Sequence, residues 1–139
     1  MGLLEDVGVY LQQQGLGTIA VTLFYGGHPD TPDDELTLFE YSGPAPEFEN
    51  SEEPFAWERP SLQLASRAVD PLTARNFVRN AWSVLIPLKN VWLIDDQGKK
   101  TRYREINPLQ SPYQVGRDDN RRFLWVANFQ IVKRPRPEL

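Results

Sequence analysis

Residues 60–85, PSLQLASRAVDPLTARNFVRNAWSVL, predict a strand, a tight turn and one amphipathic helix, around which the rest of the chain is arranged. Within residues 60–69, Leu62 and Leu64 fall on one face, while Ser61, Gln63 and Arg67 fall on the other. This period of two is typical of a strand with one buried face. The stretch therefore begins with a half-buried strand that needs a core on one side.

The helix that follows has a defined start and end. Asp70 can accept a hydrogen bond from a free backbone N–H of the first turn, and Pro71 suits the first helical position because its missing donor would be unpaired there. Pro87 ends the helix, since the residue before a proline avoids the α region. Apolar residues recur at helical spacing and predict a face that packs on a sheet: Ala74, Phe77, Val78, Ala81, Trp82 and Leu85.

The composition predicts one α+β domain over residues 1–133 and a proline-rich tail at 134–139. A chain of 139 residues, 40% of them hydrophobic, can bury roughly two-thirds of its unfolded surface. The net charge of −4 argues against general nucleic-acid binding, which needs an excess of Lys and Arg. The absence of cysteine suits a reducing cytoplasm, and neither a bilayer span nor a signal peptide is expected.

The N-terminal half predicts a helix and two strands. Apolar residues from Leu3 to Leu11 recur at helical spacing, and Gly15 to Gly17 end that helix. Residues 18–25 and 36–41 are rich in β-branched and aromatic residues and predict two strands of a meander.

Residues 42–58 form the longest predicted loop. The loop contains three Pro and five Glu, with Phe48, Phe55 and Trp57 at irregular spacing. Loops of this length are often functional, and exposed aromatic side chains are costly unless something covers them. Two interpretations stay open: these aromatics fold back onto the domain, or they contact a partner.

Two hairpins are predicted after the central helix. Residues 91–94 and 100–106 flank a turn ending at Gly98, which can take positive φ. Residues 114–115 and 122–133 flank the second turn. The return strand of the first hairpin carries cations on one face, which we call the basic face: Lys100, Arg102 and Arg104.

The strand at 122–133 is apolar on both faces in its first half, at Phe123, Leu124, Trp125 and Val126. A strand with one solvated face alternates cleanly, so something must cover each face here. The cover is either a second layer of the same domain or a neighbouring subunit. Residues 134–139, RPRPEL, cannot extend a ladder because alternate prolines lack donors; they predict a frayed end, with a docking strap as the alternative.

No catalytic, cofactor or metal site is predicted, and the chain is not expected to be an enzyme. His28 is the only histidine and is expected to be solvated in a loop. The acidic stretch from Asp30 to Glu35 lacks the spacing of a calcium loop and is interpreted as solvated. Neither a nuclease acidic-x-Lys pair, nor a nucleophile elbow, nor a phosphate-binding loop is present.

A family resemblance rests on three stretches. Residues 59–64 lead into the central helix, residues 109–113 read LQSPY, and residues 116–123 read GRDDNRRF and open the aromatic strand that ends at 128–131. This pattern resembles the tail terminators of tailed bacteriophages, small minor capsid proteins also called tail-to-head joining proteins. The resemblance covers most of the chain from Leu3 to Lys133.

The resemblance implies an α+β fold whose mostly antiparallel sheet packs against two helices, in a virion protein without catalysis. Such proteins, made in the host cytoplasm, form a ring, commonly a hexamer, that caps the tail tube at the neck and faces the head-completion or connector protein. DNA passes through the lumen without specific binding. A ring needs a heterologous interface, and its candidate residues are Lys100, Arg102, Arg104, Phe123, Leu124, Trp125, Val126, Phe48, Phe55 and Trp57.

Two other functions stay open. A head-completion or connector protein would share the composition and the ring symmetry. A monomeric protein-binding domain would instead use the aromatics of residues 42–58.

Overall fold

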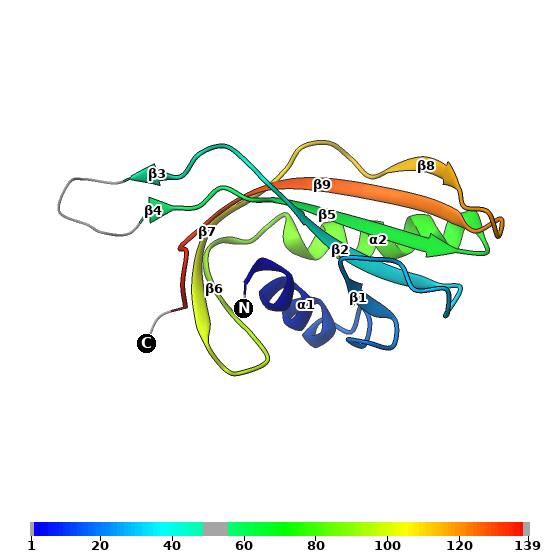
Figure 1. The fold of residues 1–139 in the computed structure, drawn as a ribbon, viewed down its shortest axis with the longest axis horizontal. Coiled ribbons are helices and arrows are strands. Elements are labelled where there is room, and N and C mark those ends of the chain that lie inside the picture. Colours follow the sequence, from blue (N-terminus) through cyan, green and yellow to red (C-terminus); the bar gives the residue numbers. More distant parts are fainter. Residues whose placement is uncertain (1, 49–55, 138–139) are drawn as a thin grey trace.

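The structure, a computed structural model, describes residues 2–48 and 56–137 (Figure 1). Within these residues, helices and strands confirm the predicted sheet-dominated α+β class. The elements are α1 (Leu3–Gln13), β1 (Leu23–Tyr25), β2 (Glu35–Tyr41), β3 (Glu47–Phe48), β4 (Ala56–Trp57), β5 (Ser61–Ala68), α2 (Pro71–Leu85), β6 (Lys89–Ile94), β7 (Lys100–Pro108), β8 (Tyr113–Arg117) and β9 (Phe123–Lys133).

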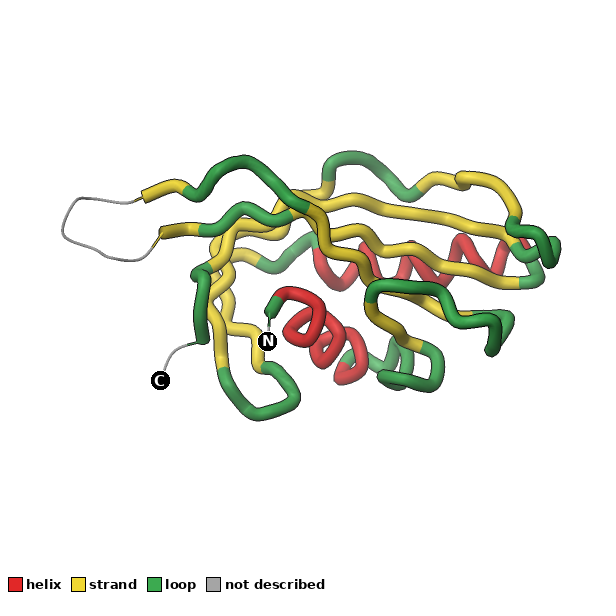
Figure 2. Tube along the Cα trace, in the orientation of Figure 1, coloured by secondary structure: helices red, strands yellow, loops and turns green. Residues whose placement is uncertain are grey.

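One curled sheet of seven strands dominates the molecule (Figures 1 and 2). Its order is β1-β2-β5-β9-β7-β6, and β8 pairs with the first part of β9. Every pair in this sheet is antiparallel except β1 with β2, which is parallel. Strands β3 and β4 pair with each other and project from the body; we call residues 42–58 the arm (Figure 1).

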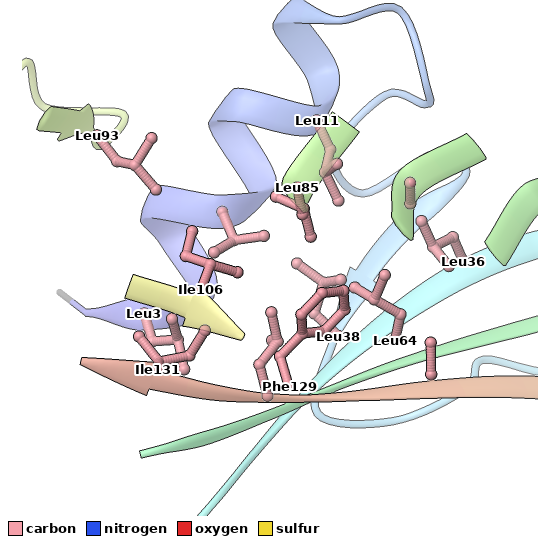
Figure 3. Close-up of a cluster of buried hydrophobic side chains, with 14 of the residues drawn as sticks. Leu3, Leu11, Leu36, Leu38, Leu64, Leu85, Leu93, Ile106, Phe129 and Ile131 are labelled. Atoms are coloured by element: carbon pink, nitrogen blue, oxygen red, sulfur yellow. The ribbon is translucent and has the colours of Figure 1, made fainter. Parts of the chain in front are cut away.

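Both helices contribute to one hydrophobic core with the sheet (Figure 3). Helix α2 lies against β5 and β9, and α1 lies against β6, β2 and β1. The predicted cap is confirmed, because the Asp70 carboxylate accepts a hydrogen bond from the Thr73 amide at 3.0 Å. The predicted apolar stripe is wrong at one position: Phe77 is 36% exposed. It lines a shallow hollow with Leu16 and Thr22 instead of entering the core.

Two contacts that the apolar periodicity of the sequence does not predict hold helix α1 in place. Gly8 is buried, and a Cβ there would lie 2.1 Å from the Tyr25 hydroxyl, so the missing side chain makes room for this ring. The Tyr103 hydroxyl donates a hydrogen bond of 2.7 Å to the Asp6 carboxylate, which is 2% exposed. Burial raises the pKa of Asp6 to about 6, although this hydrogen bond opposes the shift. The helix therefore carries a buried acid at its first turn.

The predicted meander at residues 18–25 and 36–41 is wrong in two respects. Residues 18–22 form a turn, in which the amides of Val21 and Thr22 both donate to the Thr18 carbonyl oxygen at 2.9 Å, so β1 has only three residues. β1 then runs parallel to β2 instead of antiparallel. The physical reason is that residues 26–34 run back beside β2 to the end of the sheet where β2 begins (Figure 1).

The arm contains strands where a loop was predicted. β3 and β4 have two residues each, which is too short for any periodic signal. At the root of the arm, Gly43 lies against the chain returning from β4, because a Cβ there would be 1.6 Å from the Arg59 carbonyl oxygen. The two limbs of the arm therefore touch through their backbones.

Candidate interaction surfaces

The basic face lies on the outer side of the sheet, away from both helices. Thr101 and Tyr103 are buried, so the alternating Lys100, Arg102 and Arg104 lie together on the opposite face of β7. A bulge between Tyr103 and Glu105 then shifts the alternation, and Ile106 enters the core instead of Glu105.

Trp92 of β6 lies in the basic face. Its ring is 5.1 Å from the Lys100 ammonium nitrogen and 5.4 Å from the Arg102 guanidinium carbon, and the side chain is 37% exposed. Such contacts let cations rest on an aromatic ring without a counter-ion. Within residues 2–48 and 56–137, no carboxylate forms an ion pair with Lys100, Arg102 or Arg104. Arg102 Nε is also buried without a hydrogen-bond partner in this part of the chain.

Trp57, at the end of the arm, folds back onto the domain. It is 7% exposed, with the guanidinium carbons of Arg134 and Arg104 at 3.9 and 5.7 Å from its ring centre. The Arg134 amide donates to the Arg102 carbonyl oxygen at 3.0 Å, so the tail begins as a strap on β7. Phe48 lies in β3, where its side chain is not described, and Phe55 lies outside the described residues.

The first half of β9 is enclosed on both edges by its own chain. It pairs with β5 on one side and β8 on the other. Phe123, Leu124 and Trp125 are half-buried and Val126 is 6% exposed. Strands β5 and β8 of the same chain therefore bury much of the surface of residues 123–126. The half-buried side chains of Phe123, Leu124 and Trp125 keep some surface accessible to a partner.

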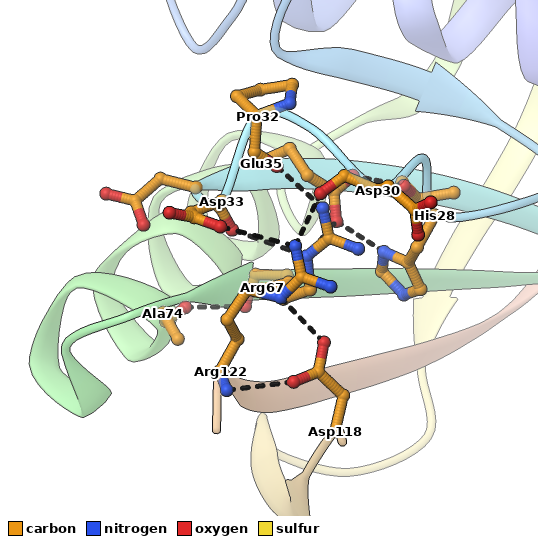
Figure 4. Close-up of polar contacts among 12 residues, drawn as sticks. His28, Asp30, Pro32, Asp33, Glu35, Arg67, Ala74, Asp118 and Arg122 are labelled. Carbon is orange, nitrogen blue, oxygen red and sulfur yellow. Dashed lines mark hydrogen bonds and ion pairs between the residues drawn. The ribbon is translucent and has the colours of Figure 1, made fainter. Parts of the chain in front are cut away.

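A polar cluster joins residues 26–34 to the sheet (Figure 4). Glu35 is fully buried, which corrects the prediction of a solvated acidic stretch. Its carboxylate contacts Nδ1 of His28, accepts a hydrogen bond from Thr37 Oγ1 and lies 3.7 Å from Nε of Arg67. His28 is therefore part of this network instead of solvated, with 24% of its side chain exposed. Arg67 is 3% exposed and also donates to the Pro32 carbonyl oxygen at 2.6 Å.

Arg122 closes the other end of the same cluster (Figure 4). Its Nε donates to Asp118 at 2.8 Å, and its NH1 group donates to the Asp30 carbonyl oxygen at 2.6 Å and lies 3.3 Å from an Asp33 carboxylate oxygen. Burial tends to raise the pKa of Asp118, but the hydrogen bonds and charge of Arg122 outweigh it and lower this pKa. Arg122 is therefore held by ion pairs with Asp33 and Asp118 of its own chain.

Comparison with known proteins identifies the family. Residues 10–134 match the family model described as "Bacteriophage tail terminator protein". The chain belongs to the bacteriophage tail terminator family. The predicted family is thus confirmed, and membership makes the chain a structural protein of the phage virion, not a member of an enzyme class.

Two solved structures share the fold of the chain at low sequence identity. One is a chain from the "Virion of native gene transfer agent (GTA) particle", with a TM-score of 0.59, 14% sequence identity and 93% of each chain covered. A second solved chain has a TM-score of 0.51 at 12% identity, covering 96% of this chain and 91% of the other. No curated protein sequence matches the chain significantly.

Two other kinds of site are absent from the described residues of this tail terminator. No group of three or more His, Asp or Glu side chains there could hold a metal ion. No helix in that part of the chain is both long and apolar enough to cross a bilayer.

No role is predicted for Trp92 from the sequence, although this residue lies in the basic face. Its position was inferable, because the hairpin turn at residues 95–98 sets the register that places Trp92 opposite Arg102. The stack of cations on this ring depends on side-chain conformations, for which the sequence gives no direct signal.

Proposed function

We propose that the chain is the subunit of a tail terminator ring, which caps the completed tail tube and joins it to the head side of the neck. Family membership supports this function. The observation that carries it is the basic face, because three outward cations without carboxylate partners in the described chain are arranged to meet another surface. A ring supplies such a surface through heterologous contacts.

The interface combines the basic face with the accessible part of residues 123–126 and with the aromatics of the arm. Phe123, Leu124 and Trp125 keep partial exposure in the isolated subunit. Phe48 and Phe55 complete the proposed surface through the arm, whereas Trp57 contributes by holding Arg104 and Arg134 in place.

The proposed partners are copies of the chain itself in a hexamer, the tail tube protein on one side and the head-completion or connector protein on the other. DNA passes through the lumen without specific binding, which suits a chain with net charge −4. The subunit acts at the tail neck of the virion, after synthesis in the host cytoplasm.

Native mass spectrometry of the purified chain, alone and mixed with its tail tubes, tests this function. We expect hexamers, at the latest on the tubes, because a template that binds the assembled form shifts the equilibrium toward it. A chain that binds isolated connectors and ignores tubes would instead be a head-completion protein. A chain that stays monomeric with both would be a protein-binding domain, and the ring would be refuted.

Deletion of the arm separates its two roles. We expect a chain in which residues 44–56 are replaced by a short Gly-Ser link to stay folded and to lose assembly on tubes. Thermal unfolding followed by circular dichroism measures the first, and native mass spectrometry measures the second. Loss of folding would show that the arm belongs to the core.

A further inference from the structure

The arm carries only negative charge. All 15 Lys and Arg residues of the chain lie at or beyond Arg59, so none lies in the arm. The acidic residues of the arm are Glu47, Glu49, Glu52, Glu53 and Glu58. Glu58, at the base, pairs with Lys133 at 3.6 Å. The other four lie within residues 47–53, together with Phe48, and no cation in this segment neutralises them.

The fold places the base of the arm beside the basic face and leads the arm out of the domain. The two limbs meet where Gly43 lies against Arg59, and β3 and β4 then lead away from the body (Figure 1). Trp57 fixes the base, because its ring lies against the guanidinium groups of Arg104 and Arg134. The direction of the paired strands therefore takes the acidic segment away from its own sheet.

The basic face reaches an open edge of the sheet. β6 is the last strand in the sheet order, so one side of its backbone has no strand partner in the described chain. Trp92 and Ile94 of β6 are 37% and 47% exposed, and they pair with Arg102 and Lys100 of β7. No carboxylate of the described chain forms an ion pair with these two cations. Charge, an aromatic ring and free backbone are thus available at one place.

We propose that the arm of one copy binds the basic face of the next copy, with the glutamates of residues 47–53 against Lys100 and Arg102. This inference rests on the proposed ring and names the contact that links its subunits. The occupant is a second copy for two reasons. The arm has the charge opposite to that of the basic face, and β3 and β4 lead it out of its own domain (Figure 1).

This contact has the asymmetry that a ring requires. The arm and the basic face are different surfaces, so each subunit binds one neighbour with its arm and receives the arm of another. Opposite charge increases the rate of association and discourages contact between two arms or between two basic faces. The charges that the described chain leaves without ion pairs thereby gain partners in the assembly.

Disulfide trapping tests this contact even when association is weak, because the chain has no cysteine of its own. One copy carries Ile94→Cys, in the basic face, and the other carries Ser51→Cys, between Glu49 and Glu52 in the sequence of the arm. Leu72→Cys on α2, which is 56% exposed, serves as the control for both. The variants are oxidised in pairs on tail tubes at low salt and separated by non-reducing electrophoresis.

We expect Ser51→Cys and Ile94→Cys to form heterodimers about fivefold more than either forms with Leu72→Cys, with the excess lost at high salt. Equal yields in all pairs would overturn the inference. The proposed terminator function would survive that result if the wild-type chain still formed hexamers on tail tubes.

A chain that carries both Ser51→Cys and Ile94→Cys distinguishes the arm of a neighbour from the arm of the same chain. Binding between copies is expected to give a ladder of covalent oligomers, because each subunit is linked to the next. A covalently closed monomer with altered mobility, and no ladder, would show that the arm binds its own basic face, which would refute the contact between copies.

Charge reversal provides an independent test. Lys100→Glu with Arg102→Glu reverses the basic face, and Glu52→Lys with Glu53→Lys reverses two charges of the arm. We expect either reversal alone to remove the excess trapping. A reversed face mixed with a reversed arm, each with its own cysteine, is expected to restore the excess. Failure of restoration in variants with intact thermal transitions would refute direct pairing of the arm with the basic face.

Discussion

Arginines on the outer face of this sheet occur in two opposite settings. In the polar cluster, Arg67 and Arg122 are almost fully buried, and carboxylates and carbonyl oxygens of residues 30–35 and 118 occupy their donors. In the basic face, Arg102 and Arg104 rest on tryptophan rings without a carboxylate partner in the described chain. The first setting fastens a segment of the chain onto its own sheet. The second leaves charge for another molecule, so the same residue type serves the fold in one place and assembly in the other.

The largest effect on stability is expected in the polar cluster. Glu35→Ala leaves Arg67 buried without its carboxylate, and breaking a buried pair from one side costs about 3–5 kcal/mol. Urea unfolding monitored by tryptophan fluorescence measures this loss. Glu40→Ala, an exposed acid on the same strand, is the control and is expected to change the free energy of unfolding by less than about 0.5 kcal/mol. If Glu35→Ala also changed the free energy of unfolding by less than about 0.5 kcal/mol, the buried ion pair would not stabilise the fold, and the proposed difference between the two arginine settings would be wrong.

The next effect depends on pH and concerns Asp6, a buried carboxyl group that accepts a hydrogen bond from the Tyr103 hydroxyl. The pKa of Asp6 is about 6 in the folded chain against an ordinary value of 3.8, so the folded state binds this proton more tightly than the unfolded state. The contribution of Asp6 to stability is therefore greatest below about pH 4 and falls as the pH rises toward 6. The total loss is about 3 kcal/mol, because each pKa unit corresponds to about 1.4 kcal/mol.

Asp6→Asn removes this titration while keeping an acceptor for the Tyr103 hydroxyl. We expect the downward slope of unfolding free energy between pH 4 and pH 6 to flatten in this variant, as measured by urea unfolding at a series of pH values. Leu72→Ala, at an exposed position on α2 without a titratable group, is expected to keep the wild-type slope. An unchanged slope in Asp6→Asn would show that another group titrates.

The smallest effect on folding is expected in the basic face. Arg102→Ala removes one contact with Trp92, which is worth at most about 1 kcal/mol at such an exposed site. The same variant is expected to lose assembly on tail tubes, because its partner is another chain. Thermal unfolding and native mass spectrometry measure the two outcomes on one sample. A large loss of stability with assembly retained would place Arg102 among the arginines that serve the fold.

Local chemistry accounts for the parts of this fold that could be predicted. The Asp70–Pro71 start and the Pro87 end fix α2 within a few residues, and the turn at 95–98 fixes the hairpin that creates the basic face. These signals act between residues close in sequence. The family resemblance at residues 59–64, 109–113 and 116–131 could likewise be identified without a structure.

Contacts between distant residues account for the parts that could not be predicted. The sequence predicts a solvated Glu35 because its partner Arg67 is 32 positions away. Arg122 likewise binds the Asp30 carbonyl oxygen, which is 92 positions away. Phe77 has helical spacing suited to a core, yet the turn at residues 15–22 leaves it at a surface hollow. The parallel pairing of β1 depends in the same way on the path of residues 26–34, which return to the end of the sheet where β2 begins.

The contact at Gly43 determines where sequence change in the arm can be tolerated. At residue 43 itself, even one methyl group would meet the Arg59 carbonyl oxygen and separate the limbs where they leave the sheet. Every amino acid except glycine has a Cβ, so the root of the arm is restricted to this one residue type.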